Sequence, residues 1–83
     1  MRYFLHLRDG ETLIEDFEGE QYVDLNAAQD DAIVAARQMM AEKIRHGEVI
    51  DGQVIEICDE DGALVATVRF SDQLALPHRT PVS

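Results

Sequence analysis

Residues 53–70 read QVIEICDEDGALVATVRF, in which two strand-like runs flank the dipeptide Asp61-Gly62. Because Asp-Gly accepts the positive φ angles of a tight turn, this stretch predicts a β-hairpin closed by a two-residue loop. A loop of that length sets Ile57 opposite Ala66 and fixes every other cross-strand pair. The two faces of the hairpin follow from this register.

The two predicted faces differ in character. The register also pairs Ile55 with Val68, so that every second side chain points the same way. The apolar face consists of Ile55, Ile57, Leu64, Ala66, Val68 and Phe70. The mixed face consists of Val54, Glu56, Cys58, Val65, Thr67 and Arg69. This contrast is typical of an antiparallel sheet that a helix covers on one side only.

The segment from Leu25 to His46 has the apolar spacing of an amphipathic helix. Asp24 is the expected N-cap, with Asn26 and Gln29 as an alternative capping pair, and Gly47 is placed to end the helix in a left-handed cap. The side chains expected to face the sheet are Leu25, Ala28, Ala32, Ala35, Ala36, Met39, Met40 and Ile44, with Ile33 at the flank.

Residues 2–8 alternate in the manner of a strand, and Asp9-Gly10 predicts a tight turn into a return strand. The cross-strand pairs expected from a two-residue turn are Arg8 with Glu11 and Leu5 with Ile14. Residues 17–23 are expected to form a connection in which Phe17 and Tyr22 cover an edge of the core.

These elements predict one α+β domain over residues 1–76, a two-layer ββαββ fold in which an antiparallel sheet of two hairpins packs on one long helix. A chain of 83 residues can build only one core. Residues 71–76 are expected to form a short turn that places Leu74 or Leu76 against the domain edge. Residues 77–83 contain two prolines and no pattern, and predict a flexible tail.

The chain is strongly acidic, with 17 acidic and 7 basic residues and a net charge of −10. Nine carboxylates and no Lys or Arg lie between Asp9 and Asp31. A field of this sign repels phosphate backbones and anionic lipids, so we expect no direct binding to nucleic acid or membranes. Solubility is the commoner role of such acidity, and a functional acidic surface is the alternative.

The start of the sequence, MRYFLHLRDGE, lacks the apolar stretch of a secretory signal. No run of about 20 apolar residues is present that could span a bilayer. Cys58 is the only cysteine, so no internal disulfide is possible, which fits a reducing compartment. We therefore expect a cytoplasmic protein.

No catalytic, metal-binding or nucleotide-binding motif stands out, so we expect neither an enzyme nor a bound cofactor or metal. His6, His46 and His78 lack the short spacings that place imidazoles on one metal. Residues 59–62 begin like a calcium loop, but a strand resumes at once, which favours a hairpin turn. Cys58 could be activated by His6 only if the two side chains were level on neighbouring strands, and a packing role is favoured.

The sheet face that points away from the helix is the candidate interaction face. It comprises Phe4, His6, Leu13, Val54, Cys58, Val65 and Thr67. One helix cannot cover both faces of a sheet, so we expect this face to bind another protein, or a second copy of the chain. Ordinary surface hydrophobes on a small protein are an equally weighted alternative. A strand edge offers a second route to a homodimer.

Three functional hypotheses follow. The first is a non-enzymatic interaction module, homodimeric through the open sheet face or a strand edge. The second is an acidic inhibitor or antitoxin-like partner of a basic or nucleic-acid-associated protein, which the carboxylates between Asp9 and Asp31 suggest. The third and weakest is a small enzyme that uses His6 with Cys58 or a nearby carboxylate.

Several segments of the sequence are similar to a known family. They are Tyr3-Phe4-x-His6-x-x-Asp9-Gly10, the helix entry Asp24-Leu25-x-x-Ala28, and Asp51-Gly52-x-x-Ile55-Glu56 with Asp59-x-x-Gly62. Up to Pro77 the chain resembles a family of small bacterial proteins known as a domain of unknown function. The resemblance implies a bacterial cytoplasmic protein and supplies no activity, ligand or functional residue. A fainter likeness to Hic-type antitoxins rests on their shared order of hairpin then helix.

Overall fold

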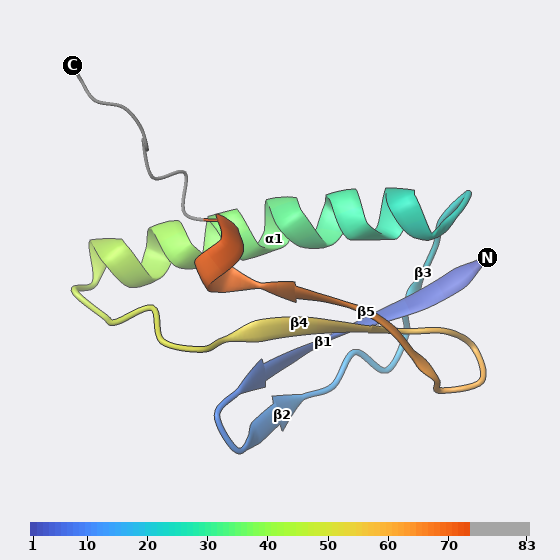
Figure 1. Cartoon of the computed structure of the whole chain (residues 1–83), viewed down its shortest axis with the longest axis horizontal. Coiled ribbons are helices and arrows are strands. Elements are labelled where there is room, and N and C mark those ends of the chain that lie inside the picture. Colours follow the sequence, from blue (N-terminus) through green and yellow to red (C-terminus); the bar gives the residue numbers. More distant parts are fainter. Residues whose placement is uncertain (74–83) are drawn as a thin grey trace.

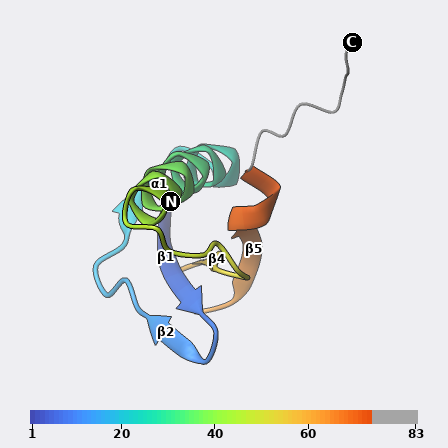
Figure 2. The same cartoon turned by 90° about the vertical axis from the view of Figure 1, so that its left-hand side faces the viewer.

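A computed structural model describes residues 1–73 and shows an antiparallel sheet with one long helix across one face (Figures 1 and 2). In chain order the elements are β1 (Arg2–Asp9), β2 (Thr12–Ile14), β3 (Glu20–Gln21), α1 (Leu25–Arg45), β4 (Val54–Cys58), β5 (Leu64–Arg69) and the 3-10 turn η1 (Phe70–Gln73). The strand order is β2-β1-β4-β5, and β3 also pairs with β1. The predicted two-layer α+β fold is therefore confirmed.

Three sequence-based expectations lie outside the described residues. They concern the positions of Leu74 and Leu76, His78, and the tail over residues 77–83. The part of the predicted short turn that is described, residues 71–73, belongs to η1. Within the described chain, no helix combines the length and the apolar character needed to cross a membrane.

Helix α1 begins and ends where its capping residues predict. The Asp24 carboxylate accepts a hydrogen bond from the Ala27 N–H at 2.9 Å, which satisfies one of the free donors of the first turn. At the other end Gly47 adopts a left-handed φ of 72°. The Glu48 N–H then donates to the Lys43 carbonyl at 2.7 Å, as in a Schellman motif.

The core lies between α1 and the sheet. Its buried apolar side chains are Tyr3, Ala28, Ala32, Ala36, Met40, Ile55, Ile57, Val68 and Phe70. The helix contributes mainly alanines, so its backbone can lie close to the larger side chains Ile57 and Phe70. Met39 and Ile44 were expected in the core but are exposed, Ile44 by 61%. The C-terminal end of α1 extends past the strands of the sheet (Figure 1), and Ile44 belongs to that last turn.

The second hairpin has the predicted register over most of its length. Ile55 pairs with Val68, and Ile57 pairs with Ala66. The loop is longer than the predicted two residues, because the Asp59 N–H donates to the Ala63 carbonyl at 3.0 Å and closes a turn around residues 60–62. This is a three-residue loop with a glycine at its left-handed position.

The start of β5 departs from the prediction. The register shifts between Ile57 and Cys58, so that Cys58 pairs with Leu64 and Val65 becomes an extra residue. A bulge of this kind breaks the alternation of faces. Leu64, which was assigned to the apolar core face, is accordingly 57% exposed and contributes nothing to the core.

The predicted register of the first hairpin was wrong by two residues. Asp9 stays in the strand, paired with Thr12, and the turn moves to Gly10 and Glu11, where Gly10 supplies a positive φ of 64°. The observed pairs are Leu7 with Ile14, Arg8 with Leu13 and Asp9 with Thr12. A slip of two residues preserves the faces, so Leu13 still shares a face with Arg8.

The connection between β2 and α1 is partly a strand. β3 pairs with the start of β1, with Gln21 opposite Arg2 and Glu20 opposite Tyr3. Tyr22 packs against the core as expected. Phe17 was expected to cover a core edge, which was wrong, since 82% of it is exposed. The short loop at residues 15–19 turns it into solvent.

Candidate functional site

The helix α1 lies on one side of the sheet only (Figure 2), and the strand pairing places residues of the candidate interaction face on the other side. Residues that lie directly opposite each other in an antiparallel sheet share a face. The cross-strand pairs on this side are Phe4 with Cys58, His6 with Glu56, Arg8 with Val54, Glu56 with Thr67, Val54 with Arg69, and Arg8 with Leu13. Val65 adjoins them at the bulge of β5. Register alone therefore brings together six of the seven predicted residues.

Their exposure differs along the face. Phe4, His6, Val54 and Cys58 are half-buried, whereas Thr67 is exposed. Leu13 and Val65, at opposite sides of the sheet, are 36% and 38% exposed. The apolar surface is thus interrupted by polar groups.

An ion pair crosses the middle of this face. The Arg8 Nε donates to the Glu56 Oε2 at 2.8 Å and ties β1 to β4. The hydrogen bond that Arg8 donates to Glu56, followed by the negative charge of Glu56, raises the pKa of Arg8. Arg69, opposite Val54 on the same side, is paired with Asp72 at 3.0 Å, so the charges here are balanced, unlike those of the acidic chain as a whole.

His6 is held by the loop at residues 15–19. Its Nδ1 accepts a hydrogen bond from the Asp16 N–H at 3.0 Å, so Nδ1 carries a lone pair and Nε2 carries the proton. The Asp16 carboxylate in turn accepts from the backbone N–H groups of Leu5, Glu18 and Gly19 at 3.1 to 3.3 Å. These bonds close the gap between β2 and β3 at the edge of β1.

Phe4 completes the same cluster. Its ring stacks on His6 with centroids 6.5 Å apart and planes inclined by 15°. It also lies against Gly19, where a Cβ would come within 2.8 Å of the Phe4 ring. Sequence reasoning singled out Phe4 and His6 but missed Asp16 and Gly19. The spacing Asp-x-x-Gly, which suits a side-chain-capped turn, was a usable signal.

Cys58 and His6 do not form an activated pair in the described chain. Cys58 lies opposite Phe4, and the Nδ1 of His6 is occupied by the Asp16 N–H. Burial, and then the charges of Glu56 and Asp59, raise the pKa of the Cys58 thiol. A nucleophilic cysteine needs the opposite shift, toward thiolate.

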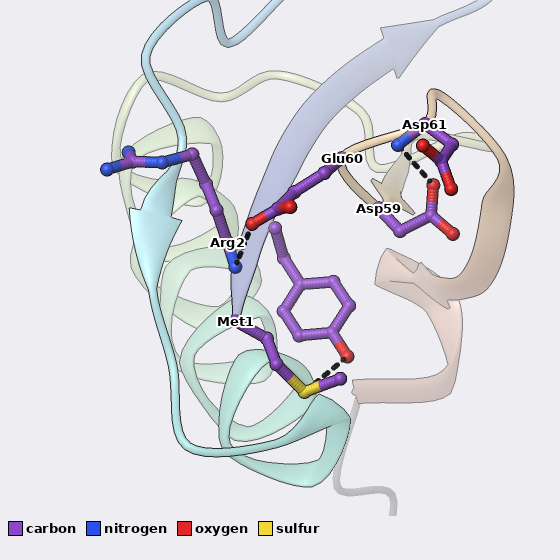
Figure 3. A pocket seen from close by; sticks show the side chains of 6 residues that line it. Met1, Arg2, Asp59, Glu60 and Asp61 are labelled. Atoms are coloured by element: carbon purple, nitrogen blue, oxygen red, sulfur yellow. Dashed lines mark hydrogen bonds between the residues drawn. The ribbon is translucent and has the colours of Figure 1, made fainter.

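A separate cleft of about 220 Å³ lies between the N-terminus and the loop that joins β4 to β5 (Figure 3). It is lined by Met1, Arg2, Tyr3, Asp59, Glu60 and Asp61. Two of the three carboxylates in its loop accept hydrogen bonds from backbone N–H groups. Glu60 accepts the Arg2 N–H at 3.1 Å, and Asp59 accepts the N–H groups of Asp61 and Ala63, each at 2.9 Å. Asp59 therefore shapes the turn, and in residues 1–73 no three metal-binding side chains gather into a site.

The fold and this face define a small α+β protein in which one helix covers one side of an antiparallel sheet. The model of the family Domain of unknown function (DUF6894) matches residues 2–71, and the chain belongs to this family. No significant match to a curated protein or to a solved structure was found. The family resemblance inferred from the sequence is confirmed, while bacterial origin and cytoplasmic location stay predictions.

Proposed function

We propose that this protein is a non-enzymatic interaction module that works as a homodimer. The supporting observation is the incomplete cover of its sheet. Within residues 1–73, α1 packs on one face only, and no further strand follows β5 at the edge (Figure 2). Free strand edges can pair with another chain, and exposed apolar surface of this kind marks interaction sites.

Charge favours a second copy as the partner. The chain carries a net charge of −10, so most approaches of two copies are repulsive. On the candidate interaction face and the neighbouring β5, Arg8 is paired with Glu56 and Arg69 with Asp72, so this side of the molecule carries little net charge. Two copies that meet on this side of the molecule avoid most of the repulsion.

Light scattering over a range of concentrations tests this function. We expect a mass twice that of the chain at micromolar concentration. Phe17→Glu is the control, since Phe17 is 82% exposed but lies outside the proposed surfaces, and its replacement should leave the mass unchanged. A monomer at every concentration would contradict the proposal. Dissociation by Phe17→Glu would also contradict it, because the association would then depend on the exposed Phe17 ring and not on the proposed surfaces.

A second candidate function is that of an acidic partner for a basic or nucleic-acid-associated protein. Its support is the edge of the sheet formed by β2 and β3, where Glu11, Glu15, Glu18 and Glu20 are all exposed. Co-purification of the wild type with a salt-sensitive basic partner would support it. The partner should be lost from a variant with glutamine at these four positions, and recovery of no basic partner would count against it.

A further inference from the structure

We propose that two copies join at β5, which extends the sheet antiparallel across a two-fold axis with Thr67 of one copy opposite Thr67 of the other. This inference rests on the proposed self-association and names its surface. The joined sheet would have the strand order β2-β1-β4-β5 followed by the same strands in reverse. The two candidate interaction faces would then form one continuous surface.

The backbone of β5 carries the first part of the argument. The Phe70 N–H donates to the Gln53 carbonyl at 2.9 Å, so these two residues form a hydrogen-bonded pair of the antiparallel ladder. Such pairs alternate with pairs that point their backbone groups outward. The backbone N–H and C=O groups of Val68 and Ala66 therefore point toward β4, and those of Thr67 between them point away from it, toward the open edge.

The same alternation is visible across the sheet. When this alternation is followed through the pairs of β5 with β4 and of β4 with β1, the backbone groups of Leu5 are expected to point away from β4. The Leu5 N–H does donate to Asp16 on that side. Arg2 has the opposite parity, and its N–H donates to Glu60 on the side of β4. The outward direction of Thr67 thus follows from a pattern that holds over three strands.

The two edges of the sheet differ in how they are protected. At the β2–β3 edge, the Leu5 N–H donates a hydrogen bond to the Asp16 carboxylate at 3.2 Å and so does not stay open for another strand. Exposed glutamates flank this position. Charges and short strands are the usual devices that keep an edge from pairing. Residues 63–71 at the other edge contain no carboxylate, proline or lysine. Their one charge, Arg69, is paired with Asp72 of its own chain at 3.0 Å.

The ends of the regular strand select the register. The bulge at Val65 limits β5 on one side, and η1 begins at Phe70 on the other. The regular segment between them is residues 66–69, and its outward-facing residues are Thr67 and Arg69. Pairing about Thr67 places both flanking residues, Ala66 and Val68, inside the regular strand, whereas pairing about Arg69 would draw η1 into the ladder. Pairing about Thr67 also sets two threonines opposite each other, a favourable cross-strand pair.

Space for a second strand is present beside this edge. A groove of about 510 Å³ runs between α1, β5 and η1, and Ile33, Thr67 and Val68 are among the residues that line it. Side chains of the second copy that point toward the helices can enter this groove. The exposed Thr67 side chain points to the other face and joins the candidate interaction face.

A cysteine crosslink tests the pairing directly. Directly opposed residues of a hydrogen-bonded antiparallel pair have Cα atoms about 5.5 Å apart, which suits a disulfide. In a Cys58→Ala background, Thr67→Cys should form an intermolecular disulfide with a mild oxidant. Thr12→Cys is the matched control, because Thr12 is an exposed threonine on β2 at the opposite edge. It should stay largely uncrosslinked.

The outcomes separate this inference from the proposed function. If the Cys58→Ala protein is dimeric but Thr67→Cys crosslinks no faster than Thr12→Cys, the β5 pairing is overturned and self-association stands. Leu13→Glu should then dissociate the dimer, since the open face would be the interface. If the Cys58→Ala protein is a monomer at every concentration, both the β5 pairing and the proposed self-association are overturned.

Amide hydrogen exchange on the unmodified chain provides a second measurement. Protection of the Thr67 amide should rise with protein concentration, while the Val68 amide, which faces β4, should be protected at every concentration. If the Thr67 amide were protected to the same high degree at every concentration, another part of the same chain would occupy the edge, and the inference would be overturned. A Thr67 amide that exchanges freely at every concentration would overturn it as well.

Discussion

The backbone N–H of Asp16 donates to the Nδ1 of His6 at 3.0 Å, and this bond joins the loop at residues 15–19 to the open face of the sheet. His6 stacks on Phe4, so two members of the candidate interaction face are positioned by one loop. The face is therefore not a set of independent surface side chains. Its shape near β1 depends on contacts that come from outside the sheet.

Replacement of His6 by leucine should destabilise the protein by about 1–2 kcal/mol, because the partly buried Asp16 N–H loses its acceptor. His6→Asn is the control, since its side-chain oxygen can take the place of Nδ1 and restore much of the loss. Urea unfolding followed by circular dichroism measures both. Equal stability of His6→Leu and the wild type would show that the bond contributes nothing.

Gly19→Ala should cost more than Gly10→Ala. Both glycines have a left-handed φ, 67° and 64°, so both variants share a backbone cost of about 1–2 kcal/mol. Only at Gly19 would the new Cβ meet neighbours, at 2.8 Å from the Phe4 ring and 2.9 Å from the Tyr3 carbonyl, whereas nothing lies within 4 Å at Gly10. The difference in unfolding free energy isolates this contact, and no difference would contradict the position of Phe4.

The Cys58 thiol should react slowly with iodoacetamide. Burial, and then the charges of Glu56 and Asp59, raise its pKa, so the thiolate forms only at a higher pH than in an unfolded chain. The alkylation profile of the native protein should therefore lie to higher pH than that of the same protein in urea. Glu56→Gln should move it back toward lower pH, and coincident native and unfolded profiles would disprove the assigned environment.

Salt should strengthen self-association. Two copies with a charge of −10 each repel one another, and raising ionic strength from about 20 mM to about 500 mM screens that repulsion. The dissociation constant from sedimentation equilibrium should fall over this range, with circular dichroism confirming an unchanged fold. Weaker association in high salt would instead indicate that opposite charges meet between copies.

The strongest sequence-based predictions came from periodicity. The alternation in residues 53–70 gave the pairs Ile55 with Val68 and Ile57 with Ala66, because a hairpin with one buried face tolerates only one such register. The cap at Asp24 was predictable for a similar local reason, since its carboxylate bonds to a residue three positions away.

The errors in the sequence-based predictions share a cause. Each depends on a contact between residues of different elements, which the apolar pattern of a single segment does not reveal. Asp9-Gly10 permits a turn at either of two positions, and only pairing of Asp9 with Thr12 decides between them. The bulge at Val65 leaves no mark on the apolar pattern and moves Leu64 out of the core. The bond of Asp16 to His6 joins residues in different elements and was invisible to periodicity.

Sedimentation equilibrium of the unmodified chain tests the central claim most directly. A chain of 9.3 kDa that works as a homodimer should show twice that mass as concentration rises, with a reversible shift toward the single chain on dilution. A mass of 9.3 kDa at every concentration, with the fold intact by circular dichroism, would contradict the claim.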